Sequence, residues 1–296
     1  MAIAMDATLF IQQVINGLVA GMSYVLIATG LTLVFGVLRI INFAHGEFYM
    51  LGALLTFYVA KLLGLDYISS TIAATLIVAV LGIIANQLFF WPLRREHEFT
   101  ILLASLGLSL FIVNGGELLF GADPKYVDSP FADETLEAGA IVVTQQRVLI
   151  FAVAAVAIGA LYAFIRYSRL GKMMRATAQN PEGAALTGVD IRFVHAYTFA
   201  MACGLAALAG ALVGPTVMVF PTVGNWAVLK GFIVVVMGGL GSVSGALVGG
   251  LLLGVVEALA GNYISLGFKE AIGYCIIILV LLWRPNGLFG AEKAAR

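Results

Sequence analysis

The sequence predicts an all-α, polytopic membrane protein that crosses the bilayer about nine times (eight to ten), with some helices short or broken. Of the 296 residues, 61% are hydrophobic and 11% are charged, whereas about a quarter of the residues in a soluble domain are charged. The charged residues also leave long stretches empty, and about 20 apolar residues are enough to span the hydrocarbon core. The stretches without Asp, Glu, Lys or Arg are 7–38, 67–93, 99–116, 148–165, 193–229 and 231–256.

The apolar runs between charged or Gly/Pro-rich breaks define nine helices. The seventh run has about 14 residues, which is short for a complete span and predicts a re-entrant or broken segment. The nine ranges are 9–36, 43–63, 67–91, 100–120, 147–166, 193–214, 226–239, 243–261 and 268–284.

Basic residues in the loops predict the orientation. Because Lys and Arg are enriched in cytoplasmic loops, the side with more of them is expected to be cytoplasmic and to hold the C-terminus. Nine crossings then put the N-terminus outside, and an even number would reverse only that second statement. The richer side has Arg39, Arg94, Arg95, Arg166, Arg169, Lys172, Arg175, Arg192, Arg284, Lys293 and Arg296, and the other side or its interface has Lys61, Lys125, Arg147, Lys230 and Lys269.

The predicted external loop, 121–146, is acidic, with five carboxylates against the single Lys125. Two interpretations are open. The loop is either a solvated acidic connector or an edge on which a partner protein docks. For docking, the candidate residues are Asp133 and Glu134.

The predicted cytoplasmic loop, 167–192, contains a short helix. Asn180 can cap it with its side-chain oxygen, Pro181 suits the first helical position, and Glu182 favours the positive end of the helix dipole. Ala184 continues the turn and Gly188 can end it in a left-handed conformation. So short a helix is marginal by itself. It is either a surface connector or a helix that sits in a groove of a cytoplasmic partner and transmits its motion.

The chain has no phosphate-binding loop of its own. No GxxxxGK[ST] motif occurs, since Gly171-Lys172 lacks both the upstream glycine and the following Ser or Thr. Any ATPase must therefore be another chain. The net charge of zero also gives no bulk attraction to nucleic acid.

Ionisable residues near the start of the second helix are unusual for a membrane segment. Asn42 can cap a helix that begins at Phe43, which places His45 and Glu47 in or near its first turn. Such groups are costly in a bilayer unless they face a cavity or a partner. The cluster is either an interfacial cap, with Glu47 balancing Arg39, or part of a translocation pathway. No metal site is expected, because a zinc site needs three or four ligands.

Two further acids lie inside predicted spans without an obvious local basic partner. Glu117 is close to Asn114 near the outer end of the fourth helix, and Glu257 lies in the outer half of the eighth. Asn114, Glu117 and Glu257 are candidates for the pathway or its gate, although partners on other helices could satisfy the two acids. Small-xxx-small steps at Gly241, Gly245 and Gly249 predict close helix packing.

Four segments, in this order, resemble the LivH-type permeases of bacterial branched-chain amino acid ABC transporters. The likeness covers about residues 10 to 290, nearly the whole chain. The segments are GLTLVFGVLRIINFAHGEFYMLGA (30–53), RATAQNPEGAALTGVDI (175–191), GGLGSVSGALVGG (238–250) and WRPNGLFG (283–290).

The resemblance implies a single transmembrane permease domain over 1–296 in the bacterial inner membrane, working by alternating access. It implies a second, LivM-type permease, two cytoplasmic ATPase subunits and a periplasmic substrate-binding protein as partners. ATP and Mg²⁺ would be bound by the ATPase subunits, and this chain would bind no cofactor and would not be an enzyme. The loop with Arg175, Asn180, Pro181, Glu182, Ala184 and Gly188 matches the ATPase-contacting loop of the family.

The alternatives concern the substrate and the mechanism. Permeases similar to these also import urea, short amides and aromatic or dicarboxylic acids. A different class, an ATP-independent secondary transporter or channel, would need coupling-ion carboxylates at the midplane. An intramembrane enzyme would need a catalytic pair, for which His45, His97 and His195 are the only histidines.

Overall fold

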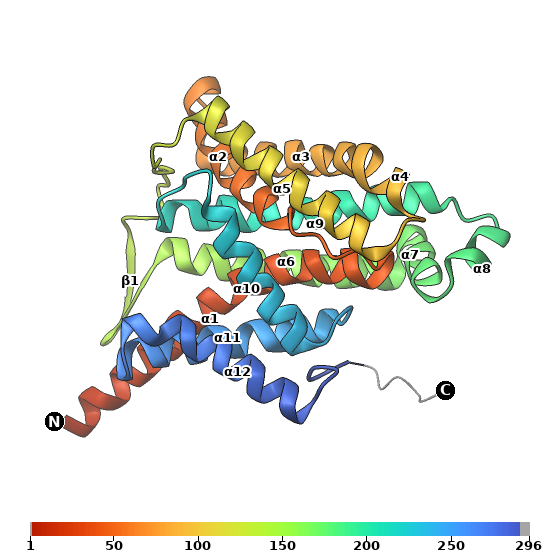
Figure 1. Ribbon diagram of the computed structural model, residues 1–296. Helices are drawn as coiled ribbons and strands as arrows, with labels where there is room; N and C mark the ends of the chain where they lie inside the picture. The colour runs from red at the N-terminus through yellow and green to blue at the C-terminus, as the bar shows by residue number, and fades with distance from the viewer. Residues whose placement is uncertain (1, 291–296) are drawn as a thin grey trace.

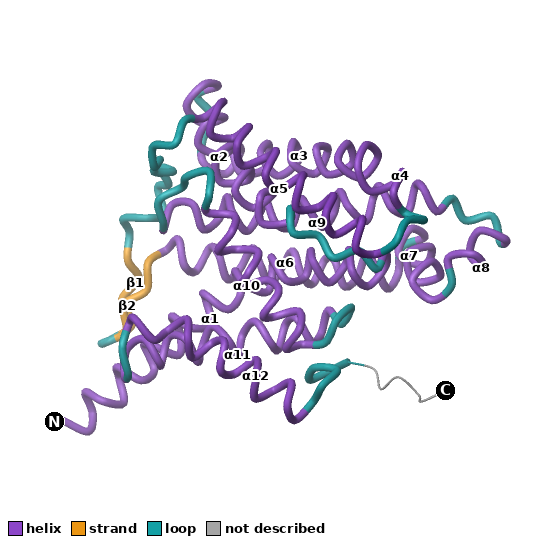
Figure 2. Tube along the Cα trace, viewed as in Figure 1, coloured by secondary structure: helices purple, strands orange, loops and turns teal. Residues whose placement is uncertain are grey.

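The computed structural model describes residues 2–290 and shows a bundle of long helices with one small β-hairpin (Figures 1 and 2). Seven helices in this part of the chain are long and apolar enough to cross a membrane. They run over Ala7–Leu38, His45–Leu63, Tyr67–Leu93, Glu98–Phe120, Gln145–Tyr167, Ile191–Thr216 and Val243–Tyr263. Met1 and residues 291–296 lie outside the description, so the assignment of Lys293 and Arg296 to one side is not tested.

These seven helices and two shorter ones correspond to the nine predicted ranges. The seventh range, 226–239, overlaps α10 (Val223–Gly238), a 16-residue apolar helix, so the prediction of a short segment there is confirmed. The ninth contains α12 (Lys269–Trp283), which has only 15 residues and follows a 3₁₀ turn at Leu266–Phe268. The figure of nine crossings is therefore approximate.

Residues 2–120 form five α-helices and two π-helical segments. Helix α1 (Ala2–Leu33) ends in a π-helical segment, Val34–Leu38, and the chain returns into the bundle as α2 (His45–Leu63). Asp66 caps α3 (Tyr67–Ala85) by accepting hydrogen bonds from two backbone N–H groups. A second π-helical segment, Asn86–Phe90, leads through α4 (Trp91–Leu93) to α5 (Glu98–Phe120).

The predicted external loop contains a β-hairpin that was not predicted from the sequence. Strands β1 (Thr135–Ala138) and β2 (Ile141–Thr144) pair antiparallel, with Thr135 opposite Thr144. The side chain of Gln12 on α1 both donates to and accepts from the backbone of Val142. The hairpin therefore marks the end of the bundle at which α1 begins, and we call this the hairpin end.

The opposite end, which we call the α8 end, carries two short helices, of which the second projects beyond the long helices (Figure 1). They are α7 (Arg169–Gln179) and α8 (Pro181–Leu186), between α6 (Gln145–Tyr167) and α9 (Ile191–Val213). Helix α9 is enclosed by α2, α3 and α1, and a 3₁₀ turn at Gly214–Thr216 extends it. The last part of the chain adds α10, α11 (Val243–Tyr263) and α12.

Glycines let the central helices touch backbone to backbone. A Cβ on Gly254 of α11 would lie 2.3 Å from the carbonyl oxygen of Gly17 on α1, and one on Gly245 would lie 2.1 Å from that of Gly238 on α10. Gly249 also faces α10, 3.1 Å from the carbonyl oxygen of Val234 by the same measure. The predicted close packing is thus confirmed for Gly245 and Gly249, which both face α10, whereas Gly241 lies in the turn before α11 with a φ of 85°.

Helix α2 begins deep inside the bundle rather than at its surface. Its first residue, His45, contacts the carbonyl oxygen of Ile27 through Nε2 at 3.2 Å. Ile27 precedes the end of the α1 span at Leu38 by 11 residues, or about 16 Å at 1.5 Å per residue. Irregular backbone at such depth is tolerated only where protein or a cavity surrounds it, and Asn42 and Ala44 in the incoming segment are fully buried.

Candidate functional site

The polar cluster at the start of α2 is completely enclosed. Asn42, His45 and Glu47 each have no exposed surface. The side-chain oxygen of Asn42 accepts a hydrogen bond from the N–H of Ala44 at 3.0 Å. It therefore orders the turn before α2, and the helix begins two residues later than the predicted start at Phe43.

Glu47 is held by a neutral neighbour and not by a base. Ser109 of α5 donates to Oε1 at 2.9 Å, and no ion pair to Glu47 occurs among residues 2–290. The interfacial alternative, in which Arg39 balances Glu47, is therefore wrong for this structure. Glu47 is buried in the first turn of α2, whereas Arg39 is exposed at the α8 end.

The start of α10 meets the start of α2 beside this carboxylate. A Cβ on Gly46 would lie 2.1 Å from the carbonyl oxygen of Gly224, and one on Gly224 would lie 2.6 Å from Oε2 of Glu47. The N–H groups at a helix N-terminus create a partial positive charge that stabilises anions. Two such termini meeting at Glu47 give a physical reason for a buried acid without a basic partner.

Three polar atoms of the cluster have no hydrogen-bond partner in the described part of the chain: Nδ2 of Asn42, Nδ1 of His45 and Oε2 of Glu47. Leaving one buried polar group unpaired costs about 1–3 kcal/mol. The cluster thus offers one carboxylate oxygen, one amide N–H and one imidazole nitrogen to a polar ligand or to water. In membrane transporters, interrupted helices that meet inside the bilayer commonly build the substrate site.

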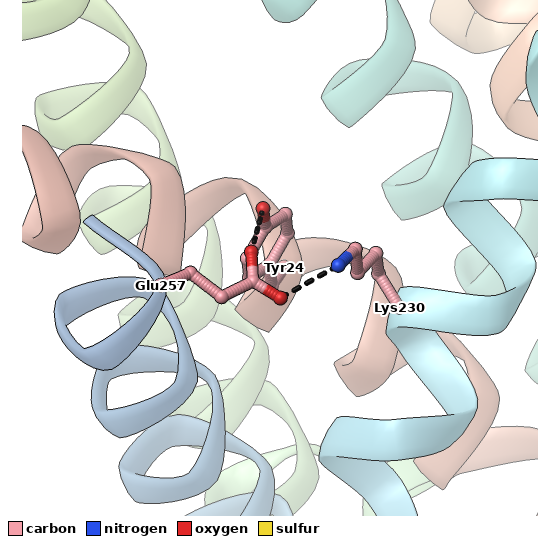
Figure 3. A network of polar contacts seen from close by, with 3 residues as sticks. All are labelled: Tyr24, Lys230 and Glu257. Carbon is pink, nitrogen blue, oxygen red and sulfur yellow. Dashed lines mark hydrogen bonds and ion pairs between the residues drawn. The ribbon is translucent and has the colours of Figure 1, made fainter. Parts of the chain in front are cut away.

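A second cluster of polar side chains, which was not predicted from the sequence, joins α1, α10 and α11 (Figure 3). The ammonium of Lys230 lies 2.6 Å from Oε1 of Glu257, and the hydroxyl of Tyr24 donates to Oε2 at 2.9 Å. The Lys230 ammonium also lies 5.9 Å from the ring centroids of Tyr24 and Trp226. All four groups therefore form one packed unit.

This arrangement confirms one interpretation and corrects one prediction. Partners on other helices satisfy Glu257, as the sequence analysis left open, whereas Lys230, predicted in an external loop or at its interface, lies buried within α10. The two side chains are only 3% and 1% exposed. An ion pair so deep in a membrane segment is expensive to desolvate, and its three elements come from distant parts of the sequence. It fixes the short helix α10 against α1 and α11.

The short helix α8 has the predicted capped form. Asn180 accepts from the N–H of Gly183 at 2.9 Å, Pro181 is the first helical residue, and Glu182 lies in the first turn. Gly188 follows the helix with a φ of 86°, in the left-handed region. Ala184 is buried, whereas Leu186 is 90% exposed. Arg175 of α7 donates to the carbonyl oxygen of Ile165 at the end of α6, which ties α7 to the bundle.

The remaining candidates do not join either polar cluster. Asn114 and Glu117 on α5 are exposed, and the Asn114 side chain only donates to the carbonyl of Leu110. Asp133 and Glu134 are also exposed, but Gln145 donates hydrogen bonds to both the backbone and the side chain of Glu134. No group of three potential metal ligands occurs among the described residues.

Comparisons with known proteins agree with this architecture. The family model described as branched-chain amino acid transport system / permease component matches residues 13–282. The chain belongs to this family. Residues 13–282 include both polar clusters and α8, so they lie within the part that the family shares.

Curated relatives match over almost their whole length. The high-affinity branched-chain amino acid transport system permease protein LivH of Salmonella typhimurium is 36% identical over 97% of both chains. The corresponding protein BraD of Pseudomonas aeruginosa is 36% identical over 97% of this chain and 98% of its own. A probable LivH of Methanocaldococcus jannaschii is 26% identical over 90% and 89%. The chain is thus a multi-pass inner-membrane permease component, as the sequence predicted.

Proposed function

We propose that this chain is the membrane-spanning permease subunit of an ATP-driven importer of branched-chain or related amino acids, and that it works by alternating access. The family match over residues 13–282 carries the proposal. The relatives named for branched-chain amino acid transport support the substrate class. Urea, short amides and aromatic or dicarboxylic acids are the less favoured substrates, and an ATP-independent transporter or channel is not favoured by this family.

In the proposed complex, this chain forms a single transmembrane domain and pairs in the membrane with a second, LivM-type permease. Two ATPase subunits lie on the cytoplasmic side and a binding protein delivers the substrate from the periplasm. The α8 end would then be cytoplasmic and would include the C-terminus. ATP and Mg²⁺ would be bound by the ATPase subunits, and this chain would have no catalytic role and no cofactor.

The geometry supports α8 as the element that transmits the motion of the ATPase to the membrane helices. It lies outside the bundle, is capped at both ends, and turns the exposed Leu186 away from the buried Ala184. A rigid helix with one apolar tip fits a groove of a soluble partner, whereas a plain connector needs neither cap.

The pathway is proposed to include Asn42, His45 and Glu47. Their unpaired atoms lie where α2 and α10 both begin. An amino acid carries an ammonium and a carboxylate in its zwitterionic form. Oε2 of Glu47 could accept from the ammonium, and Nδ2 of Asn42 could donate to the carboxylate.

The coupling part of the proposal is tested by breaking α8 without touching the membrane segments. Ala184→Pro removes the bond from the Ala184 N–H to the Asn180 carbonyl, 2.9 Å in the wild type, and proline past the first turn costs about 3 kcal/mol. Asn180→Ala removes a cap worth about 1 kcal/mol. Gln179→Ala, on the exposed last residue of α7, is the control.

The measurements are substrate uptake and ATP hydrolysis by the same reconstituted complexes, with assembly checked by co-purification. We expect uptake to fall much more than basal ATP hydrolysis in Ala184→Pro, less in Asn180→Ala, and not in Gln179→Ala. Full uptake by Ala184→Pro would reduce α8 to a connector. ATP hydrolysis by the pure, isolated chain would instead refute the assignment of the ATPase to other subunits.

A further inference from the structure

A cavity of about 440 Å³ opens at the α8 end, between the end of the α1 span, α4, α7, α8 and the start of α9. Its size is typical of a site for a small organic ligand. Three arginines line it, Arg39, Arg94 and Arg95, against one acid, Glu182. The three arginines and Glu182 are all exposed, and none of them forms an ion pair within the described residues. The cavity is therefore a site of net positive charge.

Two buried polar side chains in its wall have an atom without a partner. Thr177 is 2% exposed and His195 is 8% exposed, and both line the cavity. The hydroxyl of Thr177 and Nδ1 of His195 form no hydrogen bond in the described part of the chain. A hydroxyl and a neutral imidazole in the Nδ1–H tautomer can both donate to an anion. Unpaired donors beside three arginines indicate a missing acceptor.

The backbone that presents the arginines is unusual on both sides of the cavity. Arg39 has a φ of 56°, and among the described residues it is the one non-glycine with a positive φ. It directly follows the π-helical segment Val34–Leu38, and Arg94 and Arg95 follow the π-helical segment Asn86–Phe90 after α4. Left-handed non-glycine residues and π-helical turns are both associated with functional sites.

The surface next to the cavity is apolar and faces outward. Leu88 is 66% exposed just before the cavity residue Trp91, and Phe193 is 42% exposed between the cavity residues Ile191 and His195. Arg192 donates to the side chain of Gln87 at 2.6 Å, so these two surfaces adjoin. The guanidinium of Arg94 lies 3.9 Å from the Trp91 ring centroid. Aromatic and basic residues beside apolar surface are typical of the level at which lipid headgroups lie.

We infer that this cavity binds the phosphate headgroup of an anionic phospholipid, with the acyl chains along the apolar surface of Leu88 and Phe193. Basic pockets between transmembrane helices are a known way to hold such headgroups. The inference needs only that the chain lies in a membrane. It does not depend on the substrate or on the coupling role of α8.

The test compares charge variants by native mass spectrometry of the purified complex and by thermal stability with added lipid. The variant Arg39→Gln/Arg95→Gln leaves Arg94 on Trp91. Its matched control, Arg169→Gln/Lys172→Gln, removes two exposed basic residues of α7 that do not line the cavity. Because the cavity would lose two of the three basic side chains that line it, its affinity for an anionic headgroup is expected to fall by about thirtyfold.

We expect wild type and control to retain phosphatidylglycerol or cardiolipin and the cavity variant to lose it. Phosphatidylglycerol should raise the melting temperature of delipidated wild type, whereas phosphatidylcholine and inorganic phosphate should not. Glu182→Gln should retain more anionic lipid than wild type. Equal retention by cavity variant and control would overturn the inference, as would equal stabilisation by inorganic phosphate, which would indicate a site for a free anion.

Discussion

Removing one member of the buried Lys230–Glu257 pair should destabilise the protein far more than removing both. The two charges are 2.6 Å apart and 3% and 1% exposed, so solvent cannot compensate a lone survivor. Breaking such a pair costs about 3–5 kcal/mol, whereas replacing both partners by neutral groups is often close to neutral. We therefore expect a loss of about 3–5 kcal/mol for Lys230→Met, and for Glu257→Gln a loss toward the lower value, because the amide oxygen can still accept from Lys230 and Tyr24.

The double variant Lys230→Met/Glu257→Gln completes the cycle. It should lose less than either single variant, because no charge is then left unpaired, so the losses should be strongly non-additive. Tyr24→Phe, which removes the 2.9 Å hydrogen bond to the carboxylate, should cost about 1.5–3 kcal/mol, as expected for a bond to a charged group. The assay is equilibrium unfolding of the purified protein in detergent, with Lys172→Met and Glu96→Gln as exposed controls.

Additive losses in this cycle would refute the reasoning, because they would mean that the two side chains do not sense each other's charge. Single variants as stable as the exposed controls would refute it as well. In that case water would have to reach Lys230 and Glu257, and the two side chains would not be buried between α1, α10 and α11.

Three further predictions follow from the packing and charge of other residues. Gly52→Ala should destabilise the bundle by about 1–3 kcal/mol, because the new Cβ would lie 2.2 Å from the Ala207 carbonyl oxygen. The control Gly107→Ala, which has open space around the new Cβ, should unfold no more easily than wild type. Glu47→Gln should lower uptake by the reconstituted complex while ATP hydrolysis continues, and uptake equal to wild type would remove Glu47 from the pathway. Asp133→Lys should weaken stimulation by the binding protein, more at low salt because exposed charges are screened at high salt, and stimulation equal to that of an Asp123→Lys control would leave loop 121–146 as a spacer.

The helices could be predicted from the sequence because the bilayer imposes a simple length rule. Charged residues bound most of the spans, so the predicted ranges 67–91 and 100–120 lie inside the observed Tyr67–Leu93 and Glu98–Phe120. The α8 helix was predictable for a local reason. Its signals, Asn180, Pro181 and Gly188, are within nine residues of each other and act on the same turn.

The Lys230–Glu257 pair could not be predicted because it depends on how helices pack. Lys230 divides a long apolar stretch, so sequence alone favours its placement near a membrane surface. Its partner is 27 positions further along the chain, and Tyr24 is more than two hundred positions before Glu257. A charge-free stretch on each side, 193–229 and 231–256, was the available signal, because one isolated lysine in so apolar a region needs a buried acid.

The depth at which α2 starts explains why its polar residues were difficult to interpret. A helix that starts soon after Arg39 suggests a position at the membrane interface, where Asn42 would be a simple N-terminal cap. The structure instead carries the chain inward over 39–44, so Asn42 shapes a buried turn and Glu47 meets α10 at Gly224.

The polar cluster at the start of α2 and the Lys230–Glu257 pair both contact α10, at different positions along the helix. The ion pair holds the middle of α10 to α1 and α11, while its N-terminus adjoins Glu47. A movement of α10 would open the space beside Glu47 only if the ion pair moved with it or broke. For this reason the Lys230→Met/Glu257→Gln variant should be assayed for uptake as well as stability, since a complex that keeps its stability but loses uptake would show that the pair also sets the position of α10 during transport.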